Sequence, residues 1–205
     1  MASPAISTRE AIDEAALELF HRLGYHATSM RAIAAAAGVQ PASLYHWYPS
    51  KEAILVRMQD EFMDGLEAEL DAAMARQRTP AHVLGAAVRA HVAFHGRNQR
   101  AAFVTDTEIR ALEPAAQARL IARRDRYERL FEGPIRAGVA AGQLRCSQPK
   151  VATYAILLQC TGVALWFSSD GPLTLDDVCD VHVELVLGAV GAERGLIEDV
   201  VGATR

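Results

Sequence analysis

Side chains suited to reading the edges of base pairs are concentrated in residues 40–46 of this 205-residue chain. Amide and imidazole groups, as in Gln40 and His46, can hydrogen-bond a base edge, and small apolar side chains can pack on a thymine methyl group. The candidate base-reading residues are Gln40, Pro41, Ala42, Ser43, Tyr45 and His46. These residue types predict contact with the major groove of DNA if one exposed helix presents them.

A second group of side chains is suited to phosphate oxygens. Hydroxyl, guanidinium, ammonium and indole N–H groups are donors that can contact the nucleic-acid backbone. The candidates for backbone contact, or for support of such contacts, are Thr28, Ser29, Arg31, Trp47 and Lys51. Thr28 and Lys51 also lie at predicted helix starts, where free backbone N–H groups attract phosphate. Tyr48 is instead predicted to pack in the core as a support.

The charge distribution permits these contacts although the chain as a whole is acidic. The formal net charge is −4, from 21 basic and 25 acidic residues. Residues 20–57 nevertheless contain four basic residues and one acidic residue, Glu52. A small positive surface of this kind is sufficient to contact phosphates locally.

Three short helices at residues 7–23, 29–37 and 41–48 would have to present these side chains. Ala34 is small enough for two helices to cross closely, and Gly38 tolerates the positive φ that a tight turn requires. The apolar positions that would lock the last two helices together are Ile33, Ala37, Val39 and Leu44. This spacing predicts a helix-turn-helix, with an ordinary helical hairpin as the alternative.

The rest of the chain predicts further helices and no strands. The composition is 51% hydrophobic and 22% charged, which is typical of a globular protein, and abundant alanine favours helix. We predict an all-α fold of about nine helices. The further helices are expected at residues 51–77, 80–95, 98–112, 114–141, 149–167 and 174–191.

Cysteine usage and hydropathy indicate the compartment. The three cysteines are widely spaced, with no Cys-x-x-Cys motif, so a reducing environment is expected. No apolar run reaches the roughly 18 residues of a membrane span, and residues 1–8 have no apolar signal core. We therefore expect a cytoplasmic protein without a membrane partner.

Two histidines and a set of arginines are the other candidates for chemistry. His91 and His95 are one helical turn apart, a spacing that could chelate a metal, but no third ligand lies nearby in sequence. A polar pocket wall or hydrogen-bonded core histidines are therefore favoured. Arginines that could bind a phosphate-bearing nucleotide lie on residues 114–141 and on neighbouring segments. They are Arg97, Arg100, Arg110, Arg119, Arg123 and Arg126; the alternative for each is pairing with an acidic residue.

Long motifs in the first quarter of the chain resemble the DNA-binding domain of the tetracycline-repressor (TetR) family. They read Gly-Tyr-His-Ala-Thr-Ser-Met-Arg-Ala-Ile-Ala at residues 24–34, Ala-Gly-Val at 37–39 and Ser-Leu-Tyr-His-Trp-Tyr-Pro-Ser-Lys-Glu-Ala-Ile-Leu at 43–55. The resemblance implies a DNA-binding domain at residues 1–50 and a helical ligand-binding and dimerisation domain at 51–205. It places Tyr45 at a DNA-contacting position. The family often has His where this chain has Trp47, so Trp47 could contact DNA or be partly buried.

The second domain is similar to the TetR subgroup that controls fatty-acid or steroid catabolism in response to acyl-CoA. The similar segments are residues 91–95, 103–112, 123–128 and 162–167. The resemblance implies an acyl-CoA thioester as effector and no other cofactor. The candidate ligand-binding residues are Phe62, Leu66, His91, Phe94, His95, Phe103, Arg110, Arg123, Tyr127 and Trp166; Trp166 could equally belong to a dimer interface.

Residues 149–167 and 174–191 are expected to form a homodimer through a four-helix bundle. Two-fold symmetry then predicts a palindromic double-stranded operator. The expected function is that of a repressor released from DNA by a small ligand. The alternatives are a ligand-independent DNA-binding dimer, an activator of the same family and, remotely, an enzyme; no nucleophile–base pair or phosphate-binding loop favours the last.

Overall fold

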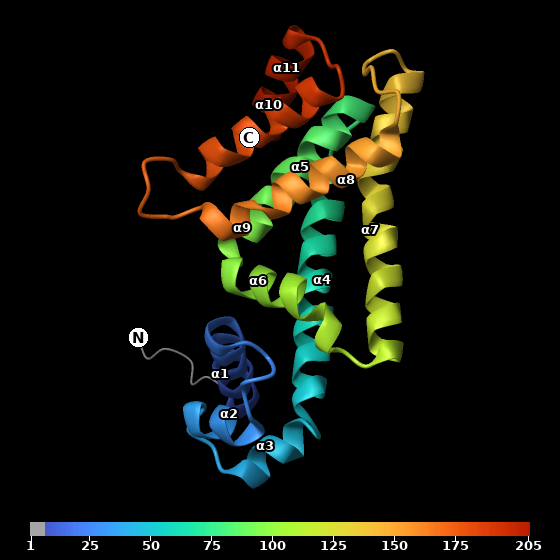
Figure 1. Cartoon of the computed structure of the whole chain (residues 1–205). Coiled ribbons are helices and arrows are strands. Elements are labelled where there is room, and N and C mark those ends of the chain that lie inside the picture. The colour runs from blue at the N-terminus through green and yellow to red at the C-terminus, as the bar shows by residue number, and fades with distance from the viewer. Residues whose placement is uncertain (1–6) are drawn as a thin grey trace. The chain divides into compact units, whose positions relative to one another are not determined.

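The computed structural model describes residues 7–205 and confirms the all-α fold, with eleven α-helices and one 3-10 helix in this range. Residues 1–6, which belong to the predicted domain at 1–50 and to the segment without a signal core, lie outside the described part. Two compact units are present (Figure 1). The first comprises residues 7–63 and Arg100–Leu120, and the second comprises Asp64–Gln99 and Ile121–Arg205.

The first unit begins with α1 (Thr8–Leu23), whose ends are set by local signals. The Ser7 hydroxyl accepts a hydrogen bond from the Glu10 N–H, and the Glu10 carboxylate accepts one from the Ser7 N–H, which satisfies two free donors at the start. Gly24 ends the helix with φ +82°. The residues of α1 that are buried recur every fourth position and are Ile12, Ala16 and Phe20.

The next two helices form the predicted helix-turn-helix. They are α2 (Met30–Ala36) and α3 (Pro41–Trp47), joined by a turn in which Gly38 has φ +67°. A side chain with a Cβ is strained in that conformation. The side chains that hold the two helices together are fully buried and include Ile33, Ala34 and Leu44.

Parts of α4, α6, η1 and α7 complete the first unit. Their full bounds are α4 (Lys51–Met74), α6 (Gln99–Thr107), η1 (Glu108–Ala111) and α7 (Pro114–Ala140). The Gln59 amide donates to the Thr105 carbonyl oxygen at 2.8 Å, which joins α4 to α6. The Tyr25 N–H donates to Glu108 Oε1 at 3.1 Å, so η1 holds the chain that follows α1.

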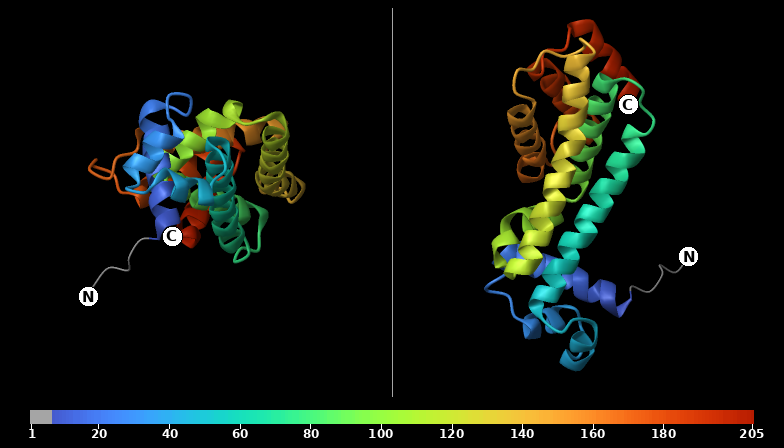
Figure 2. Two further views of the ribbon diagram at one scale, coloured as in Figure 1. Left: turned by 90° about the horizontal axis from the view of Figure 1, so that it is seen from below. Right: turned by 90° about the vertical axis from the view of Figure 1, so that its right-hand side faces the viewer.

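The second unit is built around α5 (Pro80–Arg97). This helix contacts α8 (Pro149–Thr161), α9 (Val163–Trp166), α10 (Leu175–Ala189) and α11 (Arg194–Thr204). A Cβ on Gly85 would overlap Val200 Cγ1, so glycine allows α11 to approach α5 closely. The portions of α4 and α7 in this unit lie side by side in Figures 1 and 2.

The helix count differs from the expected nine for local reasons. The helix predicted at residues 149–167 is divided at Gly162, where the Leu165 N–H bonds the carbonyl three residues back. The segment predicted as one helix at 98–112 ends in the tighter η1 turn. Residues after 191, which received no prediction, form α11. None of the described helices is both long and apolar enough to cross a membrane.

Candidate nucleic-acid interface and buried polar cluster

Helix α3 exposes the side chains that were predicted to read bases. Leu44 is fully buried and fixes which side of α3 faces the core. At about 100° per residue, Ala42 and His46 lie opposite Leu44, and Ser43 and Tyr45 flank them. All four side chains are exposed, and Tyr45 is 54% exposed. This face has the width and chemistry that a major groove accepts.

The start of α2 supplies candidates for phosphate contact. The Ser29 hydroxyl accepts a hydrogen bond from the Ala32 N–H at 3.1 Å. Ser29 therefore caps α2, which begins at Met30, one residue later than predicted. Arg31 is exposed and has no hydrogen-bond or ion-pair partner among residues 7–205. Its guanidinium is available to a phosphate group.

Thr28 and Lys51 hold the chain between α1 and α2, so few of their hydrogen-bond donors remain for direct phosphate contact. Thr28 is buried, and its hydroxyl donates to the carbonyl oxygen of Gly24 at 2.9 Å. Lys51 Nζ donates to the carbonyl oxygens of Tyr25 at 2.6 Å and Thr28 at 2.7 Å. These bonds use two of the three ammonium N–H groups. Both residues therefore support the interface, and a direct phosphate contact by Thr28 is excluded by its burial.

Tyr48 is buried, as predicted, and is tied to α1 by a network that the sequence did not reveal. Its hydroxyl donates to Asp13 Oδ1 and accepts from Arg9 Nε at 3.4 Å. Burial raises the pKa of both Tyr48 and Asp13 above their ordinary values. Asp13 Oδ2 also lies 3.4 Å from Arg57 Nε of α4. Asp13 thus joins α1, α4 and the end of α3.

Trp47, in contrast, is 44% exposed at the C-terminal end of α3. The Arg9 guanidinium lies 5.9 Å from the centre of its ring, and the His46 ring meets it edge-on. Arg9 and Asp13 received no role from the sequence, because their partners follow them by more than thirty residues.

The acidic residues of α1 are partly neutralised within the first unit. Arg100 donates to Glu14 at 2.9 Å and to Glu18 at 3.0 Å. Arg119 pairs with Asp60 at 2.9 Å. These pairs are exposed and contribute little stability. They occupy two of the arginines that were considered for a ligand phosphate.

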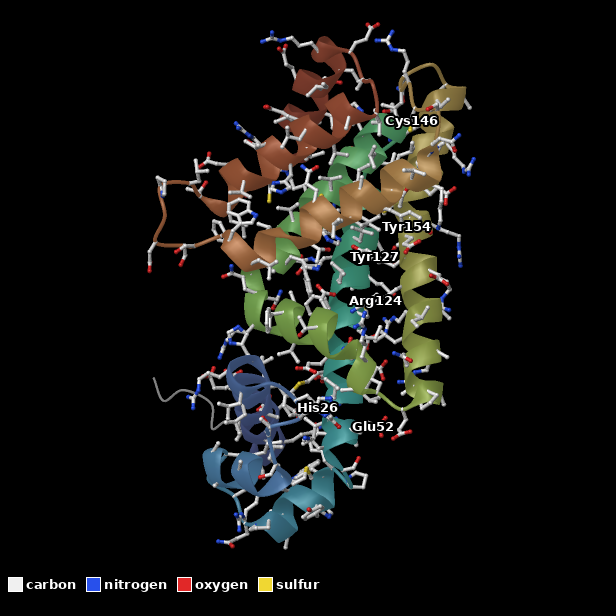
Figure 3. The ribbon with its side chains drawn as sticks, in the orientation of Figure 1. His26, Glu52, Arg124, Tyr127, Cys146 and Tyr154 are labelled. Carbon is white, nitrogen blue, oxygen red and sulfur yellow. The ribbon has the colours of Figure 1, made fainter. Side chains whose placement is uncertain are left out.

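A buried polar cluster lies in the second unit, between α5, α7 and α8. His91 Nδ1 lies 2.8 Å from the Tyr127 hydroxyl, and His91 Nε2 lies 3.1 Å from the Thr161 hydroxyl. The His95 ring stacks on the His91 ring with centres 4.0 Å apart. Phe131 meets both His91 and Tyr127. Tyr127 is labelled in Figure 3.

The cluster favours neutral side chains. Burial, followed by the nearby His95 and His182, holds the pKa of His91 well below its usual value. Burial also raises the pKa of Tyr127 well above its usual value. Hydroxyls can donate or accept, so neutral His91 keeps both hydrogen bonds in either tautomer. No group of three or more metal-ligating side chains is present among residues 7–205.

His91 should make the stability of the fold depend on pH. Its pKa is lowered in the folded protein and is about 6.5 in an unfolded chain, so between these values the unfolded chain binds more protons. The free energy of unfolding should therefore fall as pH decreases below about 6.5, by up to about 1.4 kcal/mol per pH unit. Urea unfolding between pH 5 and 7.5 measures this slope. His91→Gln, which cannot be protonated, should have a shallower slope, and an equal slope would contradict the assignment.

The guanidinium of Arg123 is bonded to acidic side chains of α4. It donates to Glu67 at 2.9 Å and 2.6 Å and to Asp64 at 2.6 Å. These bonds, first of all those to Glu67, raise the pKa of Arg123. The charge of Arg123 thus joins α7 to α4, and its role in binding a ligand phosphate stays a prediction. The alternative, in which Arg123 pairs with acidic residues, applies, but its partners lie on α4 rather than one turn away on α7.

The other predicted ligand-binding residues fall in different units. Leu66, Phe94 and His95 are buried in the second unit. Gly65 lies so close to the Phe94 ring that a Cβ would be 3.1 Å from it. The first unit contains Phe62, Phe103 and Arg110. Arg110 is exposed and has no partner among the described residues.

Trp166 lies on α9, among large exposed apolar side chains of α8, α9 and α10. It is 56% exposed, and its ring is nearly parallel to that of His182, with centres 6.2 Å apart. We define the apolar surface of α8–α10 by these large exposed side chains. They are Val151, Tyr154, Leu158, Leu165, Trp166, Val181 and Leu185. Large exposed apolar side chains concentrated on three helices that contact one another are typical of a protein–protein interface.

Comparison with known families matches both parts of the chain. The family described as "Bacterial regulatory proteins, tetR family" matches residues 12–58. The family described as "Tetracyclin repressor-like, C-terminal domain" matches residues 77–190, more than half of the chain.

Individual proteins are similar over nearly their whole length. The transcriptional repressor KstR2 of Mycolicibacterium smegmatis is 26% identical over 196 residues, which cover 94% of this chain and 95% of KstR2. A tetR-family regulatory protein from Rhodococcus RHA1 is 30% identical, with a TM-score of 0.85 over 91% of this chain and 98% of that one. AibR, crystallised with isovaleryl coenzyme A and operator DNA, is 27% identical, with a TM-score of 0.80 over 88% of this chain and 98% of AibR.

Proposed function

The chain belongs to the TetR family of bacterial regulatory proteins, and we propose that it is a repressor that leaves its operator when an acyl-CoA thioester binds. The exposed face of α3 on a helix-turn-helix supports the DNA-binding part of this proposal. DNA binding is assigned to residues 1–50, and ligand binding and dimerisation to 51–205. The regulator would act on bacterial DNA in the cytoplasm, without catalysis.

The apolar surface of α8–α10 is assigned to a homodimer. Leu158 of α8 is 80% exposed, and Leu165 of α9 is 72% exposed. Burying such side chains against a second copy is favourable at roughly 25 cal/mol per Å². Helices α8 and α10 of one copy and the same two helices of a second copy, related by a two-fold axis, would make a four-helix bundle. The two copies of α3 would then read the two halves of a palindrome.

We assign the effector to the acyl-CoA thioesters because a relative has been crystallised with one. AibR has been crystallised with isovaleryl coenzyme A, and the repressor KstR2 is a second relative over nearly full length. In the second unit, His91 and Tyr127 supply hydrogen-bonding groups among aromatic rings. Such a mixture suits the carbonyl and apolar portions of an acyl group. Release from DNA requires that the thioester bind the DNA-free state of the protein more tightly than the DNA-bound state.

A mobility-shift titration tests the proposal in two stages. Selection from random-sequence duplexes with the full chain should recover a palindrome. Isovaleryl-CoA and longer acyl-CoA thioesters are then added to the complex, with free coenzyme A as the control. We expect at least one thioester to release the DNA and free coenzyme A to have no effect. Failure to select any duplex would contradict DNA binding, whereas a complex that no thioester releases would contradict only the effector class.

Tyr127→Phe should weaken the response to the effector. The substitution keeps the ring and removes a hydroxyl that bonds His91, and one such bond contributes about 1 kcal/mol. We expect the thioester concentration for half-release to rise about 5-fold, with operator affinity unchanged without effector. Ser147→Ala, which removes an exposed hydroxyl elsewhere in the second unit, is the control. An unchanged release curve for Tyr127→Phe would remove the cluster from the effector site.

A further inference from the structure

The margin of the base-reading face carries an arginine and a tryptophan whose roles are not explained by packing alone. At about 100° per residue, Trp47 lies about 60° from the buried Leu44, between the core and the exposed face of α3. Its side chain is nevertheless 44% exposed. A helix in the major groove reads bases with its exposed face, and its margins approach the sugar-phosphate strands.

Arg9 of α1 is held at the same margin. Its guanidinium lies 5.9 Å from the centre of the Trp47 ring. Arg9 Nε donates to the Tyr48 hydroxyl at 3.4 Å, and that hydroxyl is in turn anchored on Asp13. The guanidinium is therefore positioned by a buried group and is not a freely rotating surface charge.

Two other arginines of the first unit differ from Arg9 because they lie near carboxylates. Arg22, at the far end of α1, has a Glu18 carboxylate oxygen 3.8 Å away, and Arg57 pairs with Asp13 and Glu61. Among residues 7–205, Arg9 forms no salt bridge, and only its Nε has a hydrogen-bond partner. A guanidinium has five N–H donors, so the outer ones are available to an anion.

We propose that Arg9 and Trp47 form a binding site for one backbone phosphate of the DNA strand that borders α3. Arg9 supplies a positive charge and a planar pair of donors, which match phosphate oxygens. The Trp47 indole N–H supplies a neutral donor. Asp13 and Tyr48 are positioning residues that fix Arg9 beside Trp47. This inference rests on the proposed DNA binding and adds a contact from α1 to it.

The salt dependence of operator binding distinguishes a phosphate contact from a structural role. Each neutralised phosphate contributes about −0.9 to the slope of log affinity against log salt concentration. A dimer carries two copies of Arg9, so Arg9→Gln should reduce the magnitude of the slope by about 1.8. We also expect operator affinity at low salt to fall about 10-fold. The probe is the duplex selected with the wild-type chain.

Three matched variants make the test specific. Arg22→Gln removes an arginine from the same helix and should leave the slope unchanged. Arg9→Lys keeps the charge and should restore most of the slope. Trp47→Phe removes only a neutral donor, so it should lower affinity a few-fold without changing the slope. Thermal unfolding of each variant shows whether the first unit remains folded.

Several results would overturn the inference. An unchanged slope for Arg9→Gln, on a duplex that the wild-type protein binds, would exclude the phosphate contact and leave the proposed function intact. Equal losses in Arg9→Lys and Arg9→Gln would assign Arg9 to structure instead. A wild-type chain that selected no duplex would overturn the proposed function, and this inference with it.

Discussion

Leu158→Asp should convert the protein to a monomer and lower its operator affinity by about 100-fold or more. Leu158 is the most exposed of the large apolar side chains on the surface of α8–α10. In a two-fold interface the substitution occurs twice, and each copy would place an unpaired charge in an apolar contact. A monomer holds only one copy of α3, so it loses the gain from binding two half-sites together, which is about 10²–10⁴-fold.

Sedimentation velocity and a mobility-shift titration measure the two parts of this result. Val139→Asp is a matched control, because Val139 is an exposed apolar residue of α7 outside the surface of α8–α10. It should remain dimeric and bind the operator normally. A Leu158→Asp protein that stayed dimeric with full affinity would show that the dimer uses another surface.

The double variant Tyr45→Ala/His46→Ala should lose recognition of the operator while keeping general affinity for DNA. Both side chains are exposed on α3, and the ring contact of His46 is with Trp47, which is itself 44% exposed. A good base contact contributes about 1–3 kcal/mol of discrimination, and the dimer makes each contact twice. Affinity for the selected duplex should therefore fall about 100-fold or more. Affinity for a scrambled duplex, which depends on phosphates, should change little.

Comparison with Arg31→Gln separates the two kinds of contact. Arg31 is assigned to the backbone, so its substitution should weaken binding to the selected and scrambled duplexes by similar factors. If the double variant weakened both duplexes equally, α3 would be a backbone-contacting element. If it weakened neither, the base-reading face would lie elsewhere.

The glycines, caps and apolar spacing of the first fifty residues determine their local structure strongly. Gly38 adopts the positive φ expected at the turn, Gly24 also has a positive φ, and Ser7 with Glu10 starts α1. These signals act over at most four residues, where the backbone itself limits the choices. The helix-turn-helix and the buried state of Leu44 could be predicted for this reason. The motif also led to the family, which the comparisons confirm.

The roles of individual polar side chains were decided only by the tertiary structure. Lys51 donates to carbonyl oxygens 23 and 26 residues earlier, and Arg123 bonds Glu67, 56 residues earlier. Asp13 and Arg9 find Tyr48 across more than thirty residues. A long side chain can reach many partners, and its choice depends on which helices fold against each other. The sequence alone therefore determined the all-helical fold and the position of the recognition helix, whereas packing decided which charges remain available to DNA.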